Sequence, residues 1–118
     1  MAWHTSVMGS EPGPRLAIEL VRAVGTLAAS ATRQSEIVIA AGLYPLVDEL
    51  ALNFDDLARL VPQFVERSLI TDSEAAIVAD LQKLLERMGS QLHLWKADAL
   101  TGPEWGAVRS GAARFFDV

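Results

Sequence analysis

Four acidic side chains form two adjacent pairs, Asp48 with Glu49 and, seven residues later, Asp55 with Asp56. On one continuous helix this spacing places both pairs on the same face, because seven residues make about two turns. Carboxylates in that arrangement could hold Mg²⁺ through their oxygens. Asn53, however, suits the N-cap of a new helix, and two acidic pairs alone are a weak metal pattern. We therefore predict no metal site.

Other residues that could carry chemistry are few. The two histidines, His4 and His93, have no carboxylate or second histidine at the spacing of a metal site. The chain has no cysteine, which excludes disulfides, thiolate metal sites and thiol nucleophiles. It also lacks a phosphate-binding loop, a dinucleotide glycine pattern and a nucleophile elbow. We assign no catalytic residue, expect no cofactor and favour a non-enzymatic role.

The net charge of −5 is concentrated in one part of the chain. Residues 48–80 hold eight carboxylates and two arginines, a net charge of −6, whereas residues 81–118 have a net charge of +1. A negative surface attracts basic proteins and repels phosphate backbones. We predict a protein partner with a basic surface and no nucleic acid. The alternative is that the acids form a solvated helix face.

Residues 34–50 partly match a helix-turn-helix, but the second half of the match fails. Asp48 stands where the second helix of that motif needs an apolar core residue, and Tyr44 and Pro45 are awkward at the start of that second helix. Residues 43–58 contain no Lys, Arg or Gln that could meet phosphates and bases. This segment therefore does not predict DNA binding.

The clearest helix pattern covers residues 71–89. Thr71 and Glu74 have the spacing of a capping box, in which each side chain satisfies a free backbone N–H at the helix start. From Ile77 to Met88, apolar residues recur at helical spacing and form one face. A helix with one apolar face needs neighbours that cover it.

Similar periodicity predicts helices at residues 14–31, 33–42, 45–52, from 53 through the region of Pro62, and from 101 onwards, with one turn at 96–100. Proline removes a backbone donor, so we expect Pro62 to kink or split its helix. Residues 1–13 lack periodicity and predict a flexible N-terminal arm. The fold class is therefore all-α, with residues 14–118 forming a single compact bundle of about five to seven helices.

Residues 16–42 are apolar over a broad face, which is typical of a central helix or of a homodimer interface. They do not predict a membrane protein, because Glu19 and Arg22 interrupt the apolar run and leave stretches too short to span a bilayer. No basic region precedes the small residues at 29–31, so no signal peptide is predicted. We expect no membrane partner and a cytoplasmic location.

Most aromatic residues fall on predicted inner faces, and Trp95 is the exception. It lies in a connection between helices, where we expect it to be partly exposed. Exposed tryptophans are frequent anchors of protein interfaces. The alternative is that Trp95 forms a lid over the end of the bundle.

Between Leu43 and Val108, several short runs share a texture of acidic helices and spaced tryptophans. These runs are Leu43 to Leu50, Phe54 to Leu57, Leu69 with Ile70, Leu94 with Trp95, Glu104 with Trp105, and Val108 with Arg109. In helix order, acidity and tryptophan placement, the stretch resembles small helical proteins encoded beside bacterial toxins as immunity or inhibitor proteins. The resemblance implies stoichiometric binding that blocks a toxin, often through acidic residues against a basic cleft.

Three functions follow from these observations. The first is a protein-binding module in which Asp48, Glu49, Asp55 and Asp56 face a basic partner and Trp95 supplies an apolar anchor. The second is a small enzyme or ligand-binding protein with a pocket lined by aromatic residues. The third is a structural protein that dimerises through residues 16–42.

Overall fold

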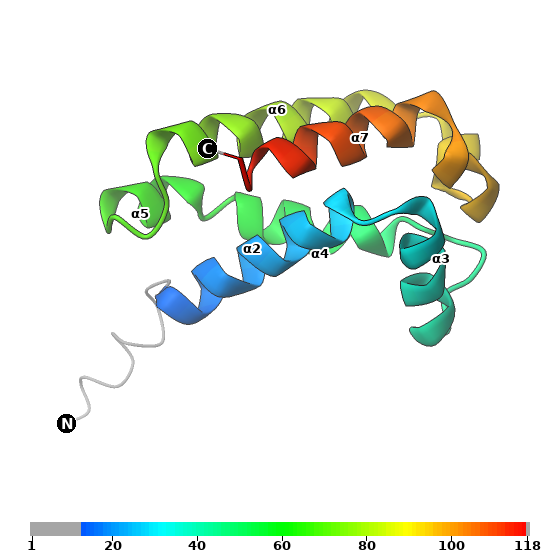
Figure 1. Cartoon of the computed structure of the whole chain (residues 1–118), viewed down its shortest axis with the longest axis horizontal. Coiled ribbons are helices and arrows are strands. Elements are labelled where there is room, and N and C mark those ends of the chain that lie inside the picture. Colours follow the sequence, from blue (N-terminus) through cyan, green and yellow to red (C-terminus); the bar gives the residue numbers. More distant parts are fainter. Residues whose placement is uncertain (1–12, 118) are drawn as a thin grey trace.

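The computed structural model describes residues 13–117, which form six α-helices and two short 3₁₀ helices (Figure 1). The α-helices are α2 (Pro14–Ala28), α3 (Ala31–Ala40), α4 (Glu49–Ala58), α5 (Val61–Glu66), α6 (Asp72–Met88) and α7 (Pro103–Arg114), and the 3₁₀ helices are η1 (Leu92–Trp95) and η2 (Ala97–Thr101). The prediction of an all-α bundle is confirmed. The arm predicted at residues 1–13 lies outside the described residues except for Gly13, and so does His4.

Helix α6 is the element that the sequence predicts best. The capping box is formed: the Thr71 hydroxyl accepts a hydrogen bond from the Glu74 N–H at 3.1 Å, and the Glu74 carboxylate accepts one from the Thr71 N–H at 2.8 Å. Its apolar face is buried from Ile77 to Met88. The predicted range therefore matches the helix, which has Thr71 as its N-cap and Gly89 as its C-cap.

The helices pack in two layers (Figure 1). In one layer α6 and α7 run antiparallel, side by side, and in the other α2 lies against α4. Helix α2 also contacts α7, which explains its broad apolar face: Leu20, Val24 and Leu27 are fully buried within the chain's own core. The homodimer through residues 16–42 stays a prediction, and Ile18 and Ile39 are the most exposed large apolar side chains of that range.

Asn53 does not start a helix, and the predicted boundary there is wrong. A single helix, α4, runs through Asn53, which is exposed in its middle. The predicted helix at 45–52 is also wrong at its start, because residues 45–47 lie outside any helix and pair through backbone hydrogen bonds with residues 95–97. Phe54 and Leu57 continue the buried face of Leu50, and this burial outweighs the local preference of asparagine for a cap.

Pro62 separates two helices. Helix α4 ends at Ala58, and α5 begins at Val61 with Pro62 in its first turn, where the missing N–H costs little. Helix α2 ends three residues earlier than predicted because Ser30 caps α3, its hydroxyl accepting the Arg33 N–H at 3.1 Å. Among the helices of residues 13–117, none has the length and apolar character needed to cross a membrane.

Candidate binding surface around Trp95

Trp95 lies at the end of η1, and its ring is fixed by two contacts. The indole N–H donates a hydrogen bond to the Met88 carbonyl at 3.0 Å, which also accepts the Gln91 N–H at the end of α6. The ring meets that of Trp105 edge to face, with 5.8 Å between centroids. Trp105 is fully buried and donates to the Leu94 carbonyl at 2.7 Å. The half-buried Trp95 therefore stands on a rigid base.

A short antiparallel pairing brings Leu46 to the same place. The Val47 N–H donates to the Trp95 carbonyl at 3.0 Å, and the Ala97 N–H donates to the Pro45 carbonyl at 2.7 Å. Leu46 therefore lies opposite Lys96 in an isolated β-bridge. Residues about fifty apart in the chain thus form one edge of a surface depression.

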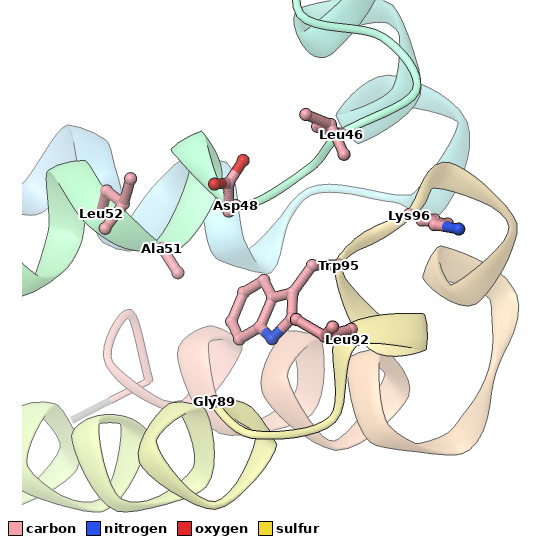
Figure 2. A pocket seen from close by; sticks show the side chains of 8 residues that line it. All are labelled: Leu46, Asp48, Ala51, Leu52, Gly89, Leu92, Trp95 and Lys96. Carbon is pink, nitrogen blue, oxygen red and sulfur yellow. The ribbon is translucent and has the colours of Figure 1, made fainter.

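We call this depression the tryptophan groove, and Figure 2 shows its lining. It has a volume of about 550 Å³ and is lined by Leu46, Asp48, Ala51, Leu52, Gly89, Leu92, Trp95 and Lys96. Three of these side chains are exposed leucines: Leu46 is 51% exposed, Leu52 53% and Leu92 78%. Large apolar side chains gathered on one exposed face are typical of a surface that another molecule covers.

The four predicted acids do not act as one group, because α4 divides them. Asp48 lines the tryptophan groove, and Asp55 lines an adjoining hollow between α4 and α6 that also includes Trp95 and Glu86. Glu49 follows Asp48 by one residue, a rotation of about 100° around the helix. It lines a different hollow, beside Leu43 and Asn53. At two turns from Glu49, Asp56 shares its side of α4.

The electrostatics of the surface are weak and local. Asp55 forms an ion pair with Arg59 at 3.2 Å, but both side chains are largely exposed, so the pair contributes little to stability. Asp48 and Lys96 place one charge of each sign on the rim of the groove. Within residues 13–117, no group of three or more acidic or histidine side chains could hold a metal ion.

Sequence reasoning missed the three leucines of the groove. Leu52 lies outside the buried stripe of α4, and Leu92 lies in a connection without periodicity. Leu46 falls on the inner face of the helix predicted at residues 45–52, and that prediction is wrong, because Leu46 is outside the helix and exposed. An off-stripe leucine in α4 was the available signal. It could not show that three such residues would meet.

Sequence reasoning also missed a buried polar network centred on Gln34. Gln34 is fully buried, and its amide donates to the Thr26 and Leu27 carbonyls at 3.2 and 3.0 Å. The Arg109 guanidinium donates to the Gln34 side-chain oxygen at 3.3 Å and to the Leu100 carbonyl. The network thus joins the end of α2 to α3, α7 and η2.

Comparisons with models of protein families, with curated proteins and with solved structures found no match to this chain.

Proposed function

We propose that this protein is a non-enzymatic binding module whose tryptophan groove receives an apolar side chain of a partner protein. The observation that carries the proposal is the meeting of Trp95 with three exposed leucines in one groove. Covering these side chains removes apolar area from water, which is favourable by roughly 25 cal/mol per Å² before the costs of association are subtracted.

Charge complementarity selects the kind of partner. Asp48 and Glu86 flank the groove and its adjoining hollow without an ion pair in the described part of the chain. Basic residues beside the partner's apolar anchor would meet these carboxylates. Such contacts accelerate association and set orientation more than they add affinity. Glu49 and Asp56, on the other side of α4, are secondary in this proposal.

A more specific form of the proposal makes the protein an inhibitor. The resemblance to toxin immunity proteins suggests that the partner is a toxin whose basic cleft is blocked by this acidic and apolar surface. A cytoplasmic location belongs to the same proposal, because a chain without cysteines needs no oxidising compartment.

A small apolar ligand is the second candidate for the same groove. The volume of about 550 Å³ falls within the range of ligand pockets, and the lining is mainly apolar. This candidate would not need the flanking acids, so salt and charge changes distinguish it from the first.

Affinity capture from lysate of the source cells tests the leading proposal. The bait carries Leu52→Ser with Leu92→Ser, and the captured proteins are compared with those of the unaltered chain by mass spectrometry. We expect a basic protein to be lost from the variant. After purification, its affinity should be at least about tenfold weaker for the variant, because interface anchors contribute more than their neighbours.

A matched control carries Ile18→Ser with Ile39→Ser, two aliphatic side chains of similar exposure, at 53% and 57%, that do not line the groove. It should bind as the unaltered chain does. Capture of the same proteins by all three baits would disprove the proposal. An acidic partner, or an affinity that does not fall as salt is raised, would remove the role of the carboxylates.

A further inference from the structure

A second groove lies between α6 and α7, which run side by side (Figure 1). It has a volume of about 430 Å³, and its lining includes three cations, Lys83, Arg87 and Arg114, with one carboxylate, Asp80. We call it the cationic groove. It is separate from the tryptophan groove, whose lining includes no residue of α6. It also lies on a different face of α6 from the adjoining hollow, because Lys83 is rotated by about 100° from Gln82, which lines that hollow.

Small residues of α7 create this groove. A Cβ atom on Gly111 would lie 3.3 Å from a Leu81 methyl carbon and 3.8 Å from one of Leu84. The glycine therefore allows α7 to approach α6 closely. Ala107 and Ser110 continue the same low wall. Leu84 is half-buried, so the floor of the groove remains partly apolar.

No carboxylate of residues 13–117 neutralises the three cations of the groove. In residues 13–117, Lys83, Arg87 and Arg114 form no ion pair, whereas Arg22, Arg33 and Arg59 each pair with a carboxylate three or four residues away. Lys83 and Arg87 lie one helical turn apart on α6, a rise of about 6 Å. Helix-dipole stabilisation accounts for Arg87 and Arg114, which lie in last turns, but not for Lys83.

We propose that the cationic groove docks an acidic segment of a partner protein, whose carboxylates pair with Lys83, Arg87 and Arg114 while an apolar side chain covers Leu84. Guanidinium groups match carboxylates through two parallel hydrogen bonds. The apolar floor fits a side chain better than it fits a phosphate backbone.

This inference goes beyond the proposed function, because it concerns another surface and a partner of opposite charge. The probe is a synthetic peptide with the repeated sequence Glu-Leu-Glu-Glu, titrated into ¹⁵N-labelled protein. We expect chemical-shift changes at the amides of Lys83, Arg87 and Ser110 and none around Trp95. Lys83→Gln with Arg87→Gln and Arg114→Gln should weaken binding at least about fivefold, since each exposed pair contributes modestly.

The matched control replaces Arg15, Arg22 and Arg33 with Gln. It removes as many positive charges as the groove variant does, but from α2 and α3. It should bind the peptide unchanged. If the triple groove variant unfolds, Lys83→Glu alone, at an exposed site within α6, should still abolish the shifts at Ser110.

Four outcomes would overturn the inference. One is an equal response to a peptide with Gln in place of Glu. Another is full binding by the groove variant or by Lys83→Glu. A third is tighter binding of oligothymidylate than of the peptide, which would make the groove a nucleic-acid surface. The last is a change in the chemical shifts of both Lys83 and Asp55 as the protein concentration is raised without peptide. It would show that the acidic α4 of a second copy covers the groove.

Discussion

The two grooves both lie close to α6 and differ in nearly everything else. The cationic groove runs along the helix, whereas the tryptophan groove lies past its C-terminal end at Gly89. The tryptophan groove is built from α4, η1 and two extended connections, and its lining gathers exposed leucines around Trp95. The cationic groove is built from two regular helices, and its lining gathers unpaired cations over small residues. An acidic chain thus presents two different surfaces. One is predominantly apolar and flanked by carboxylates, and the other is basic. The average charge of the chain describes neither groove.

The difference also concerns what holds each groove in place. The cationic groove depends on the packing of α6 against α7, which the buried stripes of both helices stabilise. The tryptophan groove depends on a few hydrogen bonds of irregular segments, above all those of Val47 with Trp95 and of Trp105 with Leu94. Loss of those bonds should therefore affect one groove far more than the other.

The largest effect is expected from Trp105→Ala. The side chain is fully buried, so the free energy of unfolding should fall by about 3–5 kcal/mol, as in other deletions of large core side chains. Trp95→Ala should cost clearly less because that ring is half-exposed. Urea denaturation of both variants measures the difference. Equal losses would mean that Trp95 is a core residue and that the groove is no separate surface.

A smaller loss is expected from Gln34→Leu. The change removes the side-chain donor to the Thr26 and Leu27 carbonyls and one acceptor of Arg109. Thr26 keeps the Ala29 N–H and Arg109 keeps the Leu100 carbonyl, so stability should fall by about 1–3 kcal/mol. The network reaches η2, which packs against η1, the helix that carries Trp95. The chemical shift of the Trp95 indole should therefore change, while the amide shifts of Lys83 and Arg87 should not.

The exposed Gln63→Leu is the control for this change and should alter stability by less than about 0.5 kcal/mol. Shifts of equal size in both grooves for Gln34→Leu would contradict the separation argued above. An unchanged free energy of unfolding would show that the buried network contributes nothing.

The smallest effect is expected from Thr71→Ala, which removes the acceptor that caps α6. Stability should fall by about 1 kcal/mol. Both grooves lie farther along the helix, so peptide and partner binding should be unaffected. Thr32→Ala, at an exposed position with no capping bond, should cause no such loss. Weaker binding in either groove for Thr71→Ala would show that the end of α6 transmits strain along the helix.

Sequence reasoning predicted the fold class and the best-defined helix, but it placed the boundaries around Asn53 incorrectly. It named Trp95 and all four acids, yet only Asp48, Asp55 and Trp95 come together on one surface. The capping preference of asparagine is a local effect of about 1 kcal/mol. The burial of Phe54 and Leu57 on the same helix is larger, so tertiary packing overrode the local signal.

The sequence by itself determined the all-helical character of the described chain, the capped start of α6 and the burial of its apolar stripe, because helical periodicity and capping act between residues a few positions apart. Only the tertiary structure decided that Leu46, Leu52 and Leu92 meet around Trp95, and that Lys83 and Arg114 line one groove. Those contacts join residues that are far apart in the chain, and their geometry follows from how whole helices pack.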